Sequence, residues 1–517
     1  MNKTSTPLRT IAHIFFENAS ATPGKPAIWC DGTELSYRML SSLVSAWSHG
    51  MRNRGIVRGD HIGVLLPNSI EFVVLMLAAA DIGAVLVPLN MTFAPVTVRK
   101  AFEACDVKHV VACGWVLDSL FTDSVAGFSQ VDGVWLAVGK TTTHVESVEE
   151  MLAECVANSE PTLQAHLDDP YILTMTSGST GDPKPIILTQ RTKLNRAAAA
   201  VQMYGVTSAD KTLAATPLYH SLAERLVLIP LLNGGTSVLM TRFSSSEWLR
   251  VVAEQAVSFT IAVSSQLNQI AGVLDGDLVS DISSLRCVVS SSALLETPVK
   301  EALMKKLQCE FHECYGASEI AVASNLNTSD TREKLRSVGV AAPGVQICIL
   351  GADGEAVVPG EPGEIACKTP MIFGGYFKRP DLTRDAMWGD FFRTGDLGRM
   401  DEHGFLYFLG RKKEIIITGG INVYPVDVET VVAESVMTQE VAAFSLPDER
   451  LGEIVAVAVV PKNLVGFNLK ALRHYCATHL ADYQQPRKWF VLGTLPKNAM
   501  GKIMKSELQV QHAGNEI

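Results

Sequence analysis

The sequence contains no CxxC pair and no other spacing of cysteine and histidine that is typical of a zinc site, although it has ten cysteines. His312 lies between Cys309 and Cys314, and a buried strand residue is favoured there over a metal ligand. Cysteines scattered in this way are typical of reduced thiols. The expected location is therefore the cytoplasm.

Long apolar runs and an excess of basic charge are also missing. The N-terminus has neither the apolar run nor the cleavage site of a signal peptide. The most apolar stretch, from Phe72 to Leu89, is interrupted by Asp81, Gly83 and Pro88, so it predicts a buried helix and strand rather than a membrane span. With 44 basic and 54 acidic residues the net charge is −10, which argues against non-specific binding of nucleic acid or of an anionic membrane.

Alternating strands and helices are predicted in the first half of the chain. The 517 residues, 47% hydrophobic and 19% charged, indicate a globular protein with more than one domain. A strand is expected over 61–66, Ser69 is expected to cap a helix that runs to about Asp81, and the next strand is expected over 84–87. Such β-α-β units imply parallel sheets with helices on both faces.

The pattern changes after about residue 335, where short apolar runs alternate with turn signals such as Ala352-Asp353-Gly354. This predicts antiparallel strands. The charged run 410–414 then marks a joint between domains. The predicted fold is α/β: a large N-terminal domain (1–410) of parallel-type sheets plus an antiparallel β-barrel-like subdomain, a hinge (411–413) and a small mobile α+β C-terminal domain (414–517).

A loop of small hydroxyl residues and glycines follows the apolar run 171–175. Its sequence is Thr176-Ser177-Gly178-Ser179-Thr180-Gly181-Asp182-Pro183-Lys184. Glycines let backbone N–H groups approach phosphate oxygens, and hydroxyls and a lysine add donors. The spacing is not that of a Walker A loop. Considered alone, the loop fits an ordinary turn as well as a phosphate site.

Four further motifs, in the same order, resemble those of the adenylate-forming enzymes: acyl-CoA synthetases, peptide-synthetase adenylation domains and firefly luciferase. They are Tyr315-Gly316-Ala317-Ser318-Glu319, Phe392-Arg393-Thr394-Gly395-Asp396, Gly410-Arg411-Lys412-Lys413-Glu414 and Asn498-Ala499-Met500-Gly501-Lys502. The resemblance spans nearly the whole chain. It implies a two-step reaction, in which a carboxylate and ATP give acyl-AMP and pyrophosphate, and a nucleophile then takes the acyl group.

The resemblance also implies roles for individual residues. Glu319 would help to hold Mg²⁺, and Ser318, where the family usually has threonine, would bind the α-phosphate or the metal. Lys502 would neutralise charge between the carboxylate and the α-phosphate, and Lys413 would be the hinge residue. The expected ATP contacts are Thr176, Ser177, Gly178, Ser179, Thr180, Gly181, Lys184, Tyr315, Gly316, Asp396 and Arg411.

The acyl pocket is expected from segments near 217–222, 263–266, 290–295 and 314–317. Its predicted residues are Tyr219, His220, Val263, Ser291, Ser292, Ala293, Cys314 and Ala317, with Gly419 and Gly420 lining the thiol tunnel after the domain rotates. No acidic residue marks an α-ammonium site, so a small to medium, largely apolar acid is favoured over an amino acid. Ser291 and Ser292 replace two family glycines and should reshape the pocket. His220 is either a gate or a structural histidine.

The acceptor stays open at this point. Coenzyme A is preferred, because Gly419 and Gly420 leave room for a pantetheine arm. An amide ligase of the coronafacate-ligase type, which passes the acyl group to an amino acid amine, is the first alternative. Transfer to a carrier-protein thiol, or a non-catalytic nucleotide-binding protein, is less favoured. The expected small molecules are therefore ATP, Mg²⁺, a carboxylic acid and coenzyme A or an amine.

Overall fold

The apolar stretch from Phe72 to Leu89 folds as a helix and a strand, as its interruptions predict. The computed structural model describes residues 9–121, 128, 131–155, 160–176, 184–274, 281–327, 332–498 and 501–513. The Ser69 hydroxyl accepts a hydrogen bond from the backbone N–H of Phe72 and caps α3 (Ile70–Ile82), which is buried along nearly its whole length. Gly83, in the left-handed region, ends this helix and β4 (Val85–Pro88) follows.

Two large, mostly parallel sheets form the N-terminal part. In the first, the parallel order is β7 (Glu146–Ser147), β6 (Trp135–Val138), β5 (His109–Cys113), β3 (His61–Leu65), β4, β8 (Pro170–Thr176), with β9 (Lys184–Thr189) antiparallel at the edge. In the second, β14 (Glu310–Tyr315), β13 (Cys287–Ser291), β12 (Phe259–Val263), β10 (Lys211–Ala214), β11 (Thr236–Leu239) and β1 (Pro26–Cys30) are parallel. Antiparallel strands β15 (Ser324–Asn327), β16 (Val340–Ala341) and β2 (Thr33–Ser36) close its two edges.

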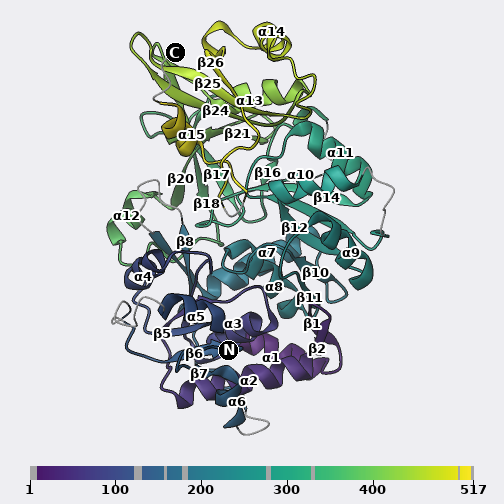
Figure 1. Ribbon diagram of the computed structural model, residues 1–517, viewed down its shortest axis with the longest axis vertical. Helices are drawn as coiled ribbons and strands as arrows, with labels where there is room; N and C mark the ends of the chain where they lie inside the picture. Colours follow the sequence, from purple (N-terminus) through teal and green to yellow (C-terminus); the bar gives the residue numbers. More distant parts are fainter. Residues whose placement is uncertain are drawn as a thin grey trace, which may run out of the picture.

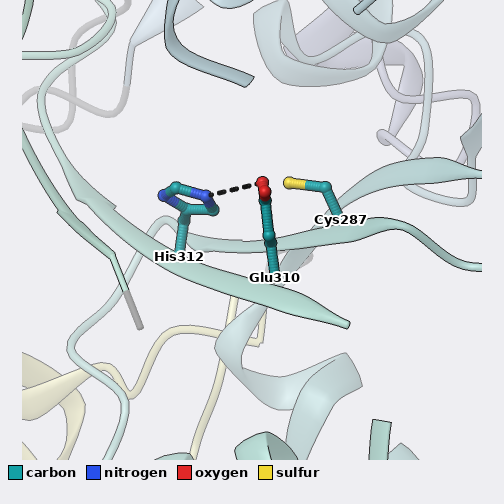
Figure 2. Close-up of side chains that lie close together, drawn as sticks. All are labelled: Cys287, Glu310 and His312. Carbon is teal, nitrogen blue, oxygen red and sulfur yellow. Dashed lines mark ion pairs between the residues drawn. The ribbon is translucent and has the colours of Figure 1, made fainter. Parts of the chain in front are cut away.

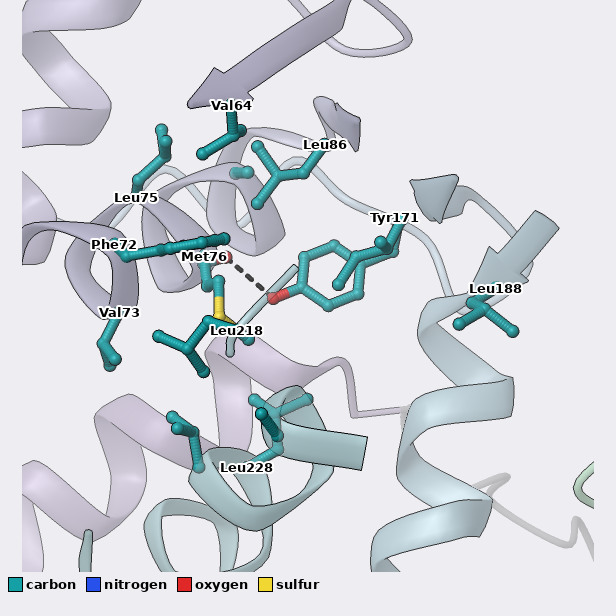
Figure 3. Close-up of a cluster of buried hydrophobic side chains, with 14 of the residues drawn as sticks. Val64, Phe72, Val73, Leu75, Met76, Leu86, Tyr171, Leu188, Leu218 and Leu228 are labelled. Carbon is teal, nitrogen blue, oxygen red and sulfur yellow. Dashed lines mark hydrogen bonds between the residues drawn. The ribbon is translucent and has the colours of Figure 1, made fainter. Parts of the chain in front are cut away.

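One apolar core joins these two sheets through the helices between them. Figure 3 shows Val64 and Leu86 of the first sheet packed with Phe72 and Met76 of α3, and the hydroxyl of the buried Tyr171 donates to the carbonyl oxygen of Met76 at 2.9 Å. The helices of this part are α1 (Ile11–Ala21), α2 (Tyr37–Asn53), α3, α4 (Pro95–Ala104), α5 (Gly114–Phe121), α6 (Val148–Ala153), α7 (Gln190–Tyr204), α8 (Ser221–Asn233), α9 (Ser245–Gln255), α10 (Ser264–Val273), α11 (Thr297–Leu307) and α12 (Pro380–Asp385).

The strands predicted after residue 335 form an antiparallel sheet. It consists of β17 (Gln346–Leu350), β18 (Gly363–Lys368), β20 (Phe391–Met400), β19 (Met387–Trp388) and β21 (Leu406–Arg411). A short 3₁₀ turn, Lys412–Glu414, then leads into β22 (Ile416–Thr418). The predicted joint thus lies between the last strand of this sheet and the first strand of the next.

The C-terminal part has cores of its own, made of residues from Ile416 onward. Its sheet contains β23 (Ile421–Val423), β22, β25 (Gly452–Pro461), β24 (Thr438–Asp448) and β26 (Lys488–Val491), covered by α13 (Pro425–Glu434), α14 (Leu469–His479) and α15 (Lys505–His512). In Figure 1 these yellow-green elements lie at one end of the long axis. A large α/β domain and a separate α+β domain therefore agree with the predicted fold class.

Candidate active site

A buried carboxylate marks the centre of the candidate site. Tyr315, at the end of β14, donates its hydroxyl hydrogen bond to Oδ2 of Asp396 at 2.8 Å. Arg411 pairs with Asp396 across β20 and β21, and its Nε lies 3.2 Å from Oδ1. Burial raises the pKa of Asp396, and Arg411 opposes that shift. Oδ1 has no hydrogen-bond partner among the described residues, so it can accept from a ligand hydroxyl.

Lys502 approaches this carboxylate from the C-terminal domain. Burial lowers the pKa of its ammonium, Arg411 lowers it further, and Glu414 and Asp396 act in the opposite direction. The turn before it is fixed by Asn498, whose Oδ1 accepts the backbone N–H of Lys502 at 3.0 Å. The structure thus brings Lys502, Asp396 and Arg411 together from two domains.

Gly501 lies against the N-terminal domain. Its φ is +73°, and a Cβ added there would lie 2.2 Å from Oγ of Ser265, near the start of α10. Such a distance is far below van der Waals contact. The two domains therefore meet here so closely that a residue with a Cβ would force Ser265 or the C-terminal domain to move.

Glu319 lies in the turn after β14 and is oriented by two neighbours. The hydroxyl of Tyr376 donates to its Oε1 at 3.0 Å, which leaves acceptor capacity on the carboxylate for a hard cation. The buried guanidinium of Arg196 donates to the backbone oxygens of Ser318 and Glu319 at 2.8 and 3.3 Å. Gly316 is required nearby, since a Cβ there would lie 1.9 Å from the carbonyl oxygen of Ala321.

The predicted phosphate loop lies between two antiparallel strands, because Thr176 ends β8 and Lys184 begins β9 opposite it. Ser177, Gly178, Ser179, Thr180 and Gly181 lie outside the described residues.

Several predicted pocket residues follow the ends of the parallel strands. Val263 ends β12, Ser291 ends β13 opposite it, and Ser292 and Ala293 follow. Cys314 and Ala317 lie at the end of β14 and just after it. Ser292 has φ +83°, a strained value for a residue with a side chain. Ser292 therefore occupies a backbone conformation that the usual family glycine would adopt without strain.

Tyr219 and His220 precede α8, with ring centroids 4.5 Å apart. Burial lowers the pKa of His220 to about 4, so its imidazole is neutral at neutral pH. Its Nε2 is buried and has no partner among the described residues. A purely structural histidine would be expected to have a hydrogen-bond partner at each ring nitrogen, so His220 does not fit that description.

Gly419 and Gly420 form the turn between β22 and β23, with φ of +58° and +81°. The described atom nearest to an added Cβ at Gly419 belongs to Leu451 of the same domain, and no described atom lies within 4 Å of an added Cβ at Gly420. In this arrangement the glycine turn is not packed against the acyl-pocket residues. Ile417 and Ile421 beside it are about half exposed.

Comparison with known proteins identifies the family. Residues 15–377 match the model of the AMP-binding enzyme, and residues 427–502 match that of the AMP-binding enzyme C-terminal domain. The chain belongs to the AMP-binding enzyme family. It is an ATP-dependent, AMP-forming ligase. The two matched segments lie on either side of the predicted hinge.

This AMP-binding enzyme is similar to acyl-CoA ligases over its whole length. It is 30% identical to a long-chain-fatty-acid–CoA ligase of Mycobacterium tuberculosis, over 98% of this chain and 99% of that one. It is 29% identical to an indoleacetate–CoA ligase of Aromatoleum aromaticum, over 95% and 96% of the two chains. Its structure is also similar to that of an amide bond synthetase from Marinactinospora thermotolerans, with a TM-score of 0.88 and 27% identity over 97% of this chain and 99% of that one.

The sequence did not single out a buried charge cluster between α7 and α8. Lys193 of α7 forms an ion pair with Glu224 of α8, and both side chains are at most 1% exposed. Burial lowers the pKa of Lys193 to about 8, with Glu224 opposing the shift and Arg196 and Arg225 adding to it. Each residue considered separately resembles a solvated helix charge, so only the packing of α7 on α8 shows that the charges are buried.

Glu224→Gln is expected to destabilise the enzyme by about 3–5 kcal/mol, because it leaves the buried cations Lys193 and Arg196 without this carboxylate. Lys193→Met should cost less, since Glu224 then still has the charge of Arg196 near it. Urea unfolding of the N-terminal domain measures both, with exposed Glu254→Gln as the control. Equal costs for Glu224→Gln and Lys193→Met would contradict this account of the cluster.

Proposed function

We propose that this enzyme is an acyl-CoA ligase, which activates a small to medium, largely apolar carboxylic acid as its adenylate and transfers the acyl group to coenzyme A. The observation that carries the proposal is the buried ammonium of Lys502 beside Asp396 and Arg411, on the border between two domains. Both reactants of adenylation are anions, so a cation at the point where they meet lowers the barrier.

In the first step a carboxylate oxygen attacks the α-phosphorus of ATP, and the bond to the oxygen that bridges to the β-phosphate breaks. Lys502 neutralises charge between the carboxylate and the α-phosphate. Oδ1 of Asp396, which accepts no hydrogen bond from the described residues, accepts the ribose hydroxyls, Arg411 assists there, and Tyr315 contacts the adenine. Lys184 and the hydroxyls of the loop 176–181 bind the phosphates.

Glu319, with the hydroxyl of Ser318, is the proposed ligand of Mg²⁺, which would offset phosphate charge when bound. Support comes from the hydrogen bond of Tyr376 to one carboxylate oxygen and from Arg196, which holds the backbone of this turn. Arg196 is thus a positioning residue for Ser318 and Glu319.

In the second step the thiol of coenzyme A loses its proton and attacks the acyl carbonyl carbon, and AMP leaves. We propose that the C-terminal domain first rotates at residues 411–413, so that Lys413 changes conformation and Gly419 and Gly420 come to line the thiol channel. Support comes from the half-exposed Ile417 and Ile421 beside that turn, which such a rotation would cover.

The relatives support this choice of acceptor. The two sequence relatives described above are named as CoA ligases, one for a fatty acid and one for indoleacetate. The neutral His220 and the absence of an acidic residue among the described predicted pocket positions favour an acid without an α-ammonium group. Ser291 and Ser292 narrow the pocket relative to glycine.

A second candidate function is amide formation, in which an amine rather than a thiol attacks the adenylate. It is favoured by the structural similarity to an amide bond synthetase. The uncharged amine attacks the acyl carbonyl carbon, the bond from that carbon to the phosphate oxygen breaks so that AMP leaves, and the amine nitrogen loses a proton.

A mass-spectrometric screen tests both candidates. The enzyme is incubated with ATP, Mg²⁺ and aliphatic, cyclic and aryl acids, with coenzyme A in one arm and mixed amino acids in the other. Thioesters confined to the first arm are the expected result. Amides confined to the second arm would replace the proposal by the amide alternative, and no return of labelled pyrophosphate into ATP with any acid would refute both.

A further inference from the structure

Three side chains with metal-binding atoms gather on one face of the nine-stranded sheet. Cys287 opens β13, and the parallel register places it opposite Glu310, which opens β14. His312 is two residues further along β14 and therefore shares that face. Figure 2 shows the three side chains pointing toward one another. They lie where the strands start, whereas Ser291 and Tyr315 lie where the same strands end, so this cluster is separate from the candidate active site.

The distances between the ligand atoms suit a cation better than direct contacts. One atom from each residue lies within 4.8 Å of the other two. Nε2 of His312 is 3.6 Å from Oε2 of Glu310, which is too long for a good N–H···O hydrogen bond. Two nitrogen or oxygen ligands about 2.1 Å from one tetrahedral Zn²⁺ would lie roughly 3.4 Å apart.

His312 is also held in a fixed orientation, as metal-binding histidines are. Its ring makes an edge contact with Tyr204, with centroids 5.2 Å apart. The side-chain amide of Asn325 lies 3.0 Å from Nδ1. The amide nitrogen faces Nδ1, and the amide oxygen accepts a hydrogen bond from the Tyr204 hydroxyl at 3.3 Å. For Nε2 to bind a cation the amide turns over, so that its oxygen accepts from the Nδ1–H and its nitrogen donates to the Tyr204 hydroxyl.

The surrounding charges permit a cation at this place. Arg286, whose charge acts on Cys287 and Glu310, is paired with Asp210 at 3.0 Å, which offsets its charge. Cys287 is fully buried, but the side chain of Glu310 is 62% exposed, so the cluster opens to solvent on the Glu310 side. A thiolate, an imidazole and a carboxylate together are ligands typical of zinc.

We propose that Cys287 Sγ, Glu310 and His312 Nε2 bind one Zn²⁺, with water as the fourth ligand. Binding displaces the thiol proton to solvent, since the thiolate is the ligand. The ion links the starts of β13 and β14, whose ends carry residues of the candidate active site. Because the cysteine comes from a different strand, 23 positions before the carboxylate in the sequence, no local spacing motif signals this site.

Cobalt(II) titration of the full chain, first treated with a chelator, tests the site. A thiolate-to-cobalt charge-transfer band in the near ultraviolet is expected at one ion per chain, and Zn²⁺ should abolish it. Cys287→Ala should remove the band. Cys476→Ala is the matched control and should keep it, because Cys476 is equally buried but lies in a core of the C-terminal domain. Circular dichroism establishes that each variant is folded.

A substitution of Glu310 tests the site without disturbing the apolar core, because this side chain is exposed. Glu310→Gln should weaken cobalt binding more than about 10-fold without unfolding the chain, and His312→Gln should do the same. No band in the unaltered enzyme, or a band that survives Cys287→Ala, would overturn the proposal. Neither outcome depends on which acid or acceptor the enzyme uses.

Discussion

Replacing Lys502 by alanine is expected to slow acyl-adenylate formation by roughly 10²–10³-fold, the loss found when one preorganised charge or donor is removed from a transition state. Burial makes its ammonium effective, because water screens it little. Exchange of labelled pyrophosphate into ATP measures this first step. The second step, measured as thioester formation from a synthetic acyl-adenylate, should change little, since Lys502 is proposed to leave before the thiol attacks.

Lys497→Ala is the matched control for this experiment. Lys497 lies on the same C-terminal hairpin and opposite Ile503, but its ammonium binds Glu440 rather than approaching Asp396. Both half-reactions should therefore survive in this variant. If Lys502→Ala slowed both half-reactions equally, the lysine would act on structure or on binding, and its assigned role in adenylation would be wrong.

The fold was predictable where local rules and tertiary packing agree. Ser69 caps the start of α3 and Gly83 caps its end. Gly83 and Pro88 thus divide one apolar run into a helix and a strand. The β-α-β unit predicted from residue 61 to residue 87 is present, with its two strands parallel. In such cases a short stretch of sequence contains both the signal to start an element and the signal to stop it.

The site was predictable only in its motifs. Tyr315, Asp396, Arg411 and Lys502 stand in recognisable short patterns, and the structure brings them together. Arg196 and Ser265 have no such pattern, because their importance comes from a carbonyl or a glycine more than a hundred residues away. Cys287 likewise meets His312 through strand register alone. Contacts of this kind depend on tertiary packing, which a single sequence does not display.

Gly501→Ala is expected to slow adenylation by about 10²-fold, as misplacement of a catalytic group by 1 Å does. The added Cβ would lie 2.2 Å from Oγ and 2.5 Å from Cβ of Ser265, so the C-terminal domain could not seat Lys502 fully. Acyl transfer should be nearly unaffected, since the proposed rotation separates Gly501 from Ser265. Pyrophosphate exchange and transfer from a synthetic acyl-adenylate again distinguish the two steps.

A double-mutant cycle with Ser265→Gly separates the clash from backbone strain. Ser265→Gly removes both clashing atoms, so the double variant should recover most of the adenylation rate lost in Gly501→Ala. The remaining deficit should reflect the φ of +73°, which costs a residue with a side chain about 1–2 kcal/mol. Gly493→Ala is the control, because it lies in the same domain and none of the described atoms is within 4 Å of the added Cβ. A double variant no faster than Gly501→Ala would mean that the contact with Ser265 does not limit closure, and that the glycine is required only for its backbone conformation.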